Sequence, residues 1–114
     1  MIVIEGQNDR LKVHVYGELT LADYREFEKA VTGGLKTAPK VQLLIDLTKM
    51  AGFTVDVAWE DIRFTRAHAN DFRRIAVVTD SQWLGWIGWL SAAFTDAEVE
   101  TFETVADAEV WLVA

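Results

Sequence analysis

Two short runs of apolar residues constrain the fold of this chain most strongly. They are VQLLID at residues 41–46 and RIAVV at residues 74–78. Continuous apolar runs are typical of strands covered on both faces, because a strand with one wet face alternates apolar and polar residues. A helical pattern separates the two runs, so a right-handed crossover is expected to place the strands parallel in one sheet. The chain is therefore predicted to have an α/β fold.

The remaining segments fit this architecture. Residues 1–5 and 11–19 are expected to form an antiparallel hairpin joined by the turn GQND, followed by a helix that begins with the capping box Thr20 and Asp23 and ends at Gly33-Gly34. Two further helices are expected from Thr54 to about Ala69 and over residues 83–95. The chain then continues with a strand over residues 98–103 and a last helix from Thr104. We predict one domain over residues 1–114 with the order β-β-α-β-α-β-α-β-α. It contains a mixed, largely parallel five-stranded sheet with about four helices, and the opening strand is antiparallel at an edge.

The composition excludes several classes of function. The chain of 114 residues has no cysteine, which excludes disulfides, thiolate metal sites and cysteine nucleophiles. Its formal net charge of -7 opposes binding to nucleic acid or to anionic membranes, both of which need a positive surface. The opening MIVIEGQNDR lacks the pattern of a secretory leader. We therefore expect a cytoplasmic, bacterial-type protein without a transmembrane segment.

The uncharged segment WLGWIGWLSAAFT at residues 83–95 is the most unusual part of the sequence. One face of a helix here carries the stripe of a core-facing helix: Trp83, Ile87, Leu90 and Phe94. The opposite side carries small residues and another tryptophan: Gly85, Gly88, Ala92 and Trp89. The run is too short for a membrane span, which needs about 20 apolar residues. Either its own domain covers both sides, or the small-residue side contacts a second subunit, a partner or an apolar ligand.

The helix after Thr54 is expected to contribute to the same contact surface. Thr54 fits as its N-cap, and Val55, Trp59 and Ile62 are expected to point inward at helical spacing. The candidate interaction surface joins the small-residue side of the tryptophan-rich helix to the aromatic residues Phe53, Trp59 and Phe64, because aromatic side chains are enriched at interface centres.

Polar residues that follow the two buried strands are the candidate chemical site. They are Asp46, Thr48, Thr79, Asp80 and Ser81. In parallel sheets, ligands bind beyond the carboxyl ends of the strands, so Asp46 and Asp80 would converge there if their strands are neighbours, as a metal-binding pair or as an acid and a base. The alternative, which we favour, is that these groups cap helices or fix loops.

No cofactor or metal motif supports a chemical role. His14 and His68 are the only histidines, and they lack the H-E-x-x-H spacing of zinc sites. His14 alternates with Val13 and Val15, which predicts a place on the more polar face of its strand and a surface or hydrogen-bonding role. We therefore expect no catalytic residues, no metal ligands and no cofactor.

The order of elements and several motifs resemble the SpoIIAA-like branch of the STAS superfamily of sulfate-transporter and anti-sigma-factor-antagonist domains. The motifs are VYGELTLADYREFEKAV, VQLLIDLTKM, DIRF, RRIAVVTDSQWLGW and DAEVWL. The resemblance covers nearly all of the chain and implies a regulatory or protein-binding domain without catalytic activity. In antagonist members, a partner kinase phosphorylates a serine in a D-S-x-G stretch after the strand that corresponds to Val41–Asp46.

The sequence departs from that pattern at the switch. After IDLTKM it reads AGFTVDVAWED, which places Thr54, Val55 and Asp56 across the motif. We expect no working serine switch, and Thr54 is the hydroxyl to test. Asp56 would supply a permanent negative charge at a helix N-terminus, which is favourable there.

Three functions follow, in order of preference. The first is a non-enzymatic regulatory or protein-interaction domain that forms a homodimer or binds a protein partner. The second is binding of a small apolar, lipid-like ligand through the tryptophan-rich helix. The third is a small enzyme that uses Asp46, Asp80 and Ser81.

Overall fold

A computed structural model describes residues 1–7, 10–80 and 97–114 of the protein. The strands in these ranges are β1 (Ile2–Gln7), β2 (Arg10–Leu19), β3 (Val41–Phe53), β4 (Phe72–Val78) and β5 (Glu98–Phe102), and the helices are α1 (Leu21–Leu35), α2 (Val55–Ala67) and α4 (Val105–Leu112). The predicted tryptophan-rich helix, with Gly85, Gly88, Trp89 and Ala92, lies outside the described residues, as does Ser81.

The described strands form one five-stranded sheet in the order β1-β2-β3-β4-β5. β1 pairs antiparallel with β2, and the three other neighbouring pairs are parallel. This confirms the predicted mixed, largely parallel sheet with an antiparallel opening strand at one edge. At the end of β1, Gly6 has a φ of 106°, and a Cβ there would lie 2.1 Å from the carbonyl oxygen of Arg10, so this turn needs glycine.

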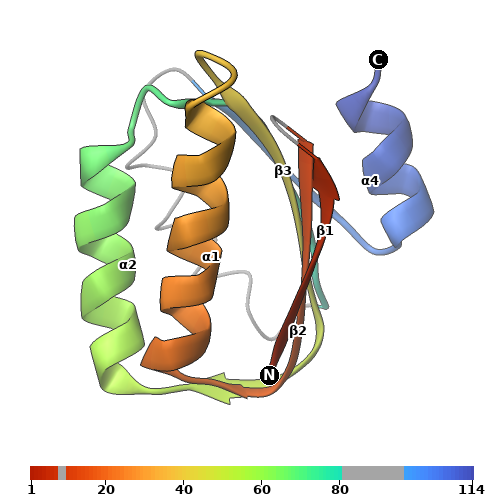
Figure 1. The fold of residues 1–114 in the computed structure, drawn as a ribbon. Coiled ribbons are helices and arrows are strands. Elements are labelled where there is room, and N and C mark those ends of the chain that lie inside the picture. The colour runs from red at the N-terminus through yellow and green to blue at the C-terminus, as the bar shows by residue number, and fades with distance from the viewer. Residues whose placement is uncertain (8–9, 81–96) are drawn as a thin grey trace.

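Helices cover both faces of the sheet, α1 and α2 on one face and α4 on the other (Figure 1). The main core lies under α1 and α2 and includes Leu43 of β3, whereas Leu44 belongs to a second cluster that contains Ala108 of α4. Successive residues of β3 therefore enter opposite cores, which explains why its first half is apolar without alternation.

Strand β3 is longer than its apolar run predicts. The strand was expected to end at Asp46, but it continues to Phe53, so Asp46 lies within β3 and not at its carboxyl end. Pairing with β2 continues beyond Asp46, where Tyr16 lies opposite Lys49 and Leu19 lies opposite Phe53. The polar residues Thr48 and Lys49 are exposed on this second half. Their polarity was misread as the end of the strand.

Helix α1 begins as predicted and ends later than predicted. The backbone N–H of Asp23 donates to Thr20 Oγ1 at 3.3 Å, and Asp23 Oδ2 accepts from the Thr20 backbone N–H at 3.2 Å, which completes the capping box. The helix continues through Gly33 and Gly34 to Leu35. Both glycines therefore lie inside the last turn of the helix, and Gly34 is buried.

The predicted inward face of α2 is wrong. Val55 and Trp59 are 75% and 70% exposed. The buried face consists instead of Val57, Asp61, Phe64 and Thr65. These residues have the spacing i, i+4, i+7, i+8 of a core-facing stripe. The prediction failed because two members of this stripe are polar, and a stripe of larger apolar residues was preferred.

Candidate functional site

The sheet brings together a histidine and a carboxylate that the sequence singled out separately. His14 on β2 and Asp46 on β3 are partners in the parallel register. The Nδ1 atom of His14 lies 3.1 Å from Asp46 Oδ2. The other ring nitrogen, Nε2, lies 3.7 Å from Glu5 Oε2 on β1. The imidazole therefore lies between carboxyl groups of the two flanking strands, and its contact with Asp46 fits the hydrogen-bonding alternative of the two roles predicted for His14.

The second oxygen of Asp46 is also occupied. Asp46 Oδ1 accepts hydrogen bonds from the backbone N–H and the Oγ1 hydroxyl of Thr48, at 3.0 Å and 2.6 Å. Burial alone would raise the pKa of this carboxyl, but the hydrogen bonds from Thr48 and His14 outweigh it and hold the pKa below the usual value. The side-chain hydrogen bonds of Asp46 to described residues are therefore made within β2 and β3.

The other predicted chemical residues lie beyond the end of β4. Thr79 is buried, and its hydroxyl donates to the carbonyl oxygen of Asp80 at 3.0 Å, while Asp80 itself is exposed. Asp46 pairs in register with Val78, so its place in the sheet is beside β4 and before Asp80. Within residues 1–7, 10–80 and 97–114, no group of three or more histidine or acidic side chains is arranged to hold a metal ion.

A buried carboxyl group on the inner face of α2, that of Asp61, was missed by the sequence analysis. Asp61 is 6% exposed, and the Tyr24 hydroxyl on α1 donates a hydrogen bond to its Oδ1 atom. The other oxygen, Oδ2, has no hydrogen-bond partner in the part of the chain that the structure describes. Burial and, to a smaller extent, the charge of Glu28 raise the pKa of Asp61 to about 6, although the hydrogen bond from Tyr24 acts to lower it.

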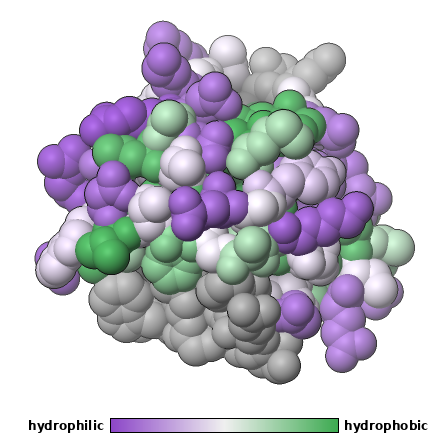
Figure 2. Space-filling model, turned by 90° about the horizontal axis from the view of Figure 1, so that it is seen from below, coloured by the Kyte–Doolittle hydropathy of each residue, from purple (hydrophilic) through white to green (hydrophobic). Residues whose placement is uncertain are grey.

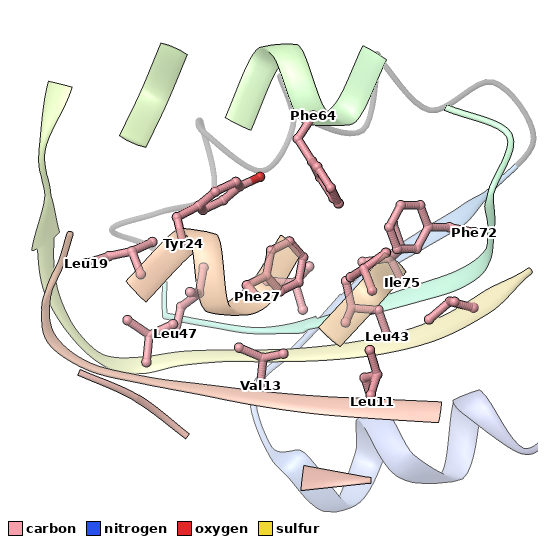
Figure 3. Packing of buried hydrophobic residues seen from close by; sticks show 14 of the residues in the cluster. Leu11, Val13, Leu19, Tyr24, Phe27, Leu43, Leu47, Phe64, Phe72 and Ile75 are labelled. Atoms are coloured by element: carbon pink, nitrogen blue, oxygen red, sulfur yellow. The ribbon is translucent and has the colours of Figure 1, made fainter. Parts of the chain in front are cut away.

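The surroundings of this pair are aromatic. The Tyr24 ring contacts the rings of Phe27 and Phe64, with centroids 5.3 Å and 6.2 Å away. In Figure 3, Tyr24 and Phe27 on α1 and Phe64 on α2 point into the space between the helices and the sheet. The signal for Asp61 in the sequence is its spacing, four residues after Val57 and three before Phe64, which places it on the buried face.

A pair of glutamates lies nearer the surface between the same two helices. The carboxyl groups of Glu28 on α1 and Glu60 on α2 are neighbours, and burial followed by the charge of Glu60 raises the pKa of Glu28. Glu60 pairs with Arg63 at 3.2 Å. These residues line an open groove of about 400 Å³ that also contains His68.

The basic residues that follow α2 are largely paired. His68 Nδ1 lies 2.7 Å from Asp71 Oδ2. Arg74 lies 3.0 Å from Glu98 and donates to the carbonyl oxygen of Trp111 at 2.7 Å. Arg74 therefore contributes to the contacts among β4, β5 and α4, and its positive charge is paired with Glu98.

The predicted interaction residues Phe53 at the end of β3 and Trp59 and Phe64 of α2 differ in exposure. Trp59 lies on the surface, Phe53 is half-buried, and Phe64 is 7% exposed and belongs to the main core. Figure 2 views the end of the molecule where α1 and α2 begin, and it shows hydrophobic and hydrophilic residues interspersed there. Of the three predicted residues that the structure describes, Trp59 is therefore the one exposed to a partner.

The start of α2 carries the residues aligned with the phosphorylation motif. Thr54 is the N-cap residue, as predicted, but its hydroxyl donates to Asp56 and makes no capping hydrogen bond. Asp56 is exposed in the first turn of the helix, and its Oδ1 accepts from the backbone N–H of Val57 at 3.0 Å. A carboxylate here lies close to the positive end of the helix dipole.

The sequence matches the SpoIIAA-like family model over residues 10–113. The chain therefore belongs to the SpoIIAA-like family, the branch of the STAS superfamily that its motifs resemble. A search of curated proteins finds no match. Among the described helices, none has the length and apolar character needed to cross a membrane.

Solved structures of similar proteins agree with the family. One is an uncharacterised DUF3478-family protein of Shewanella loihica PV-4 with a SpoIIAA-like fold. It is 29% identical to this chain with a TM-score of 0.76, and the match covers 98% of this chain and 92% of that one. The unphosphorylated anti-sigma factor antagonist SpoIIAA is 9% identical with a TM-score of 0.64 over 99% and 97% of the chains. An anti-sigma factor antagonist from Mycobacterium paratuberculosis is 15% identical with a TM-score of 0.60 over 100% and 94%. Because the two antagonists are only 9% and 15% identical to this chain, their similarity shows a shared fold and does not show a shared function.

Proposed function

We propose that this chain is a non-enzymatic regulatory domain that binds a protein partner through the exposed face of α2. The observation that carries the proposal is that Val55 and Trp59, one helical turn apart, are 75% and 70% exposed. Large apolar side chains placed together on a surface are typical of contact sites, and tryptophan is the residue most enriched among the strongest contacts. The family and the fold support a regulatory role over a catalytic one.

The partner in this proposal is a second copy of the chain. A two-fold axis beside α2 would bring Trp59 and Val55 of both copies together, so that the same apolar patch covers itself. Arg63 of the same helix is exposed and pairs with the largely buried Glu60 within one chain. The cysteine-free composition and the bacterial relatives support a bacterial cytoplasmic location.

The proposed contact does not depend on a phosphorylation switch. Asp56 already supplies a carboxylate in the first turn of α2, and it accepts hydrogen bonds from Thr54 and from the backbone of Val57. Phosphorylation of Thr54 would place a second negative group beside Asp56, where like charges repel. Binding through this face is therefore expected to be constitutive.

Sedimentation velocity over a wide range of protein concentration tests this proposal. We expect a monomer–dimer equilibrium that Trp59→Ala and Val55→Ala each weaken, because both remove apolar contact area. Val110→Ala is the matched control, since Val110 on α4 is 69% exposed and lies on the opposite side of the sheet. A chain that stays monomeric at every concentration, or a dimer weakened equally by Val110→Ala, contradicts the proposal.

A second candidate function is binding of a small apolar ligand. It is supported by a cavity beneath α1 and α2 whose described walls are almost entirely apolar. The tryptophan-rich helix that first suggested this function lies outside the described residues, so the support comes from the cavity.

A further inference from the structure

Helix α2 is held to the rest of the described structure mainly through α1. Among the described elements, α2 packs chiefly against α1, whereas α1 also packs against β1, β2 and β3. The buried face of α2 joins two apolar side chains, Val57 and Phe64, to two polar ones, Asp61 and Thr65. Because little apolar surface holds α2 in place, this helix is expected to open more easily than the sheet.

Two carboxyl oxygens without a hydrogen-bond donor are buried on these two helices. In the part of the chain that the structure describes, neither Oε1 of Glu28 on α1 nor Oδ2 of Asp61 on α2 has a hydrogen-bond partner. Asp61 is 6% exposed, and its other oxygen accepts from the Tyr24 hydroxyl, which points toward α2 in Figure 3. An ionised carboxylate is costly in such a place, and a protonated carboxyl group costs much less. Burial therefore favours a bound proton on Glu28 and on Asp61.

The neighbouring carboxyl groups act in the same direction as burial. Burial and then the charge of Glu60 raise the pKa of Glu28, and a hydrogen bond between the two carboxyl groups adds to this effect. The charge of Glu28 in turn raises the pKa of Asp61. Arg25 of α1 and Arg63 of α2 also face Glu28, and they oppose its increase in pKa without reversing it. The three acids therefore resist ionisation together.

The other groups around these acids do not neutralise them. Lys29 and His68 line the same groove as Glu28, and His68 is paired with Asp71. On the other side of Asp61, the residues of the sheet that line a cavity with it are all apolar. Within the described residues, the sheet thus supplies no counter-charge to Asp61.

We infer that Glu28, Glu60 and Asp61 form a proton-sensitive latch between α1 and α2. When Glu28 and Asp61 are protonated, Glu28 donates to Glu60 and both buried acids are neutral, so the two helices stay packed. As pH rises, the two protons pass to the solvent, and the carboxylates then repel one another and need hydration. Helix α2 separates from α1 in response, while the sheet stays folded.

The size of the effect follows from proton linkage. A carboxyl group with a raised pKa in the closed state releases its proton more easily when the latch opens, so opening becomes more favourable as pH rises. Burial raises the pKa of Asp61 from 3.8 to about 6. Since each unit is a factor of ten, the equilibrium constant for opening should increase by up to about a hundred-fold across this window. Glu28 acts in the same direction.

Amide hydrogen–deuterium exchange followed by NMR tests the latch in the wild-type chain. Exchange is measured at one pH below and one pH above the Asp61 pKa of about 6, with correction for the intrinsic exchange rates. We expect the amides of Phe64 and Thr65 to be less protected than those of Leu43 and Leu44 in β3 at both pH values. Protection of the α2 amides should fall by up to about a hundred-fold between the two.

Variants separate the latch from a merely structural role of its residues. Glu28→Gln can still donate to Glu60 but carries no charge, so it should increase protection of α2 at the higher pH. It should also move the titration of Asp61, followed by ¹³C carboxyl NMR, to lower pH, because the charge of Glu28 no longer acts on Asp61. Glu26→Gln, on an exposed acid of α1, is the matched control and should change neither.

Three results would overturn the latch. Equal protection of the α2 and β3 amides would mean that only global unfolding exposes α2, and constant protection of α2 at both pH values would remove the proton dependence. An Asp61 titration that Glu28→Gln and Glu26→Gln affect equally would remove the coupling between the carboxyl groups. The exchange in the wild type decides the first two points even if Glu28→Gln fails to fold. It is measured where the chain is monomeric, so the latch and the α2 contact can fail independently.

Discussion

The Tyr24 hydroxyl donates a hydrogen bond to Asp61 Oδ1, and this bond joins α1 to α2 inside the main core. A carboxyl group in such a place is tolerated only with a hydrogen-bond donor, because its burial costs several kcal/mol otherwise. The pair therefore links the packing of α1 against α2 to the protonation of a buried carboxyl group.

The free energy of unfolding is predicted to fall as pH rises through the titration of Asp61. Burial raises the pKa of Asp61 from 3.8 to about 6 in the folded protein, so between these values the folded state binds more protons than the unfolded state. Stability then decreases with rising pH across this window, by up to about 3 kcal/mol. The free energy of unfolding, measured by urea denaturation at several pH values in the window, should change less with pH for Asp61→Asn than for the wild type. Equal slopes would contradict the assignment.

Removing the donor to Asp61 is predicted to destabilise the protein. Tyr24→Phe keeps the aromatic packing against Phe27 and Phe64 but leaves both oxygens of Asp61 without a described donor. The expected loss is about 1–3 kcal/mol in the free energy of unfolding, measured by urea denaturation. Tyr16→Phe, on a half-buried residue of β2, is the matched control and should change stability by less than about 0.5 kcal/mol. Similar losses for both variants would count against the pair.

Asp46 is predicted to affect stability with the opposite pH dependence. Its pKa is lowered in the folded protein, so at acidic pH the unfolded state binds more protons, and the stabilisation is lost as pH falls through the folded pKa. Asp46→Asn should therefore cost about 1–3 kcal/mol at neutral pH, and the difference from the wild type should shrink in acid. A constant difference between the two unfolding curves from neutral to acidic pH would contradict this account.

The two aromatic residues of α2 are predicted to respond differently to truncation. Phe64→Ala removes a ring from the main core and should cost about 3–5 kcal/mol in the free energy of unfolding. Trp59→Ala removes an exposed ring and should change the stability of the monomer by less than about 0.5 kcal/mol. Thermal or urea unfolding at a concentration where the chain is monomeric measures both. Comparable losses would contradict the orientation of α2 that buries Phe64 and exposes Trp59.

The fold could be predicted from the sequence because apolar periodicity and capping residues act locally. Leu43 and Leu44 mark a strand with two covered faces, and Thr20 with Asp23 marks the start of a helix. The end of β3 could not be predicted this way, because the polar residues Thr48 and Lys49 remain in the strand by pairing with β2. That pairing joins residues distant in sequence and leaves no local signal.

The candidate sites were less accessible to sequence reasoning. His14 and Asp46 were each noticed, but their contact depends on the register of β2 and β3, which a single sequence does not fix. Asp61 was overlooked because a carboxylate is normally exposed, and its burial depends on the Tyr24 hydroxyl of another helix. Trp59 was predicted to point inward because a large aromatic side chain is normally buried, but it is exposed.

Cysteine cross-linking through α2 tests the central claim most directly, since the natural chain contains no cysteine to interfere. Val55→Cys introduces one thiol beside Trp59, and Val110→Cys introduces one at a similarly exposed valine of α4. In a two-fold dimer that buries the exposed face of α2, a short bis-maleimide reagent should convert Val55→Cys rapidly into covalent dimers, and Trp59→Ala in the same chain should slow the reaction. Equal, slow cross-linking of the Val55→Cys and Val110→Cys chains would contradict the claim.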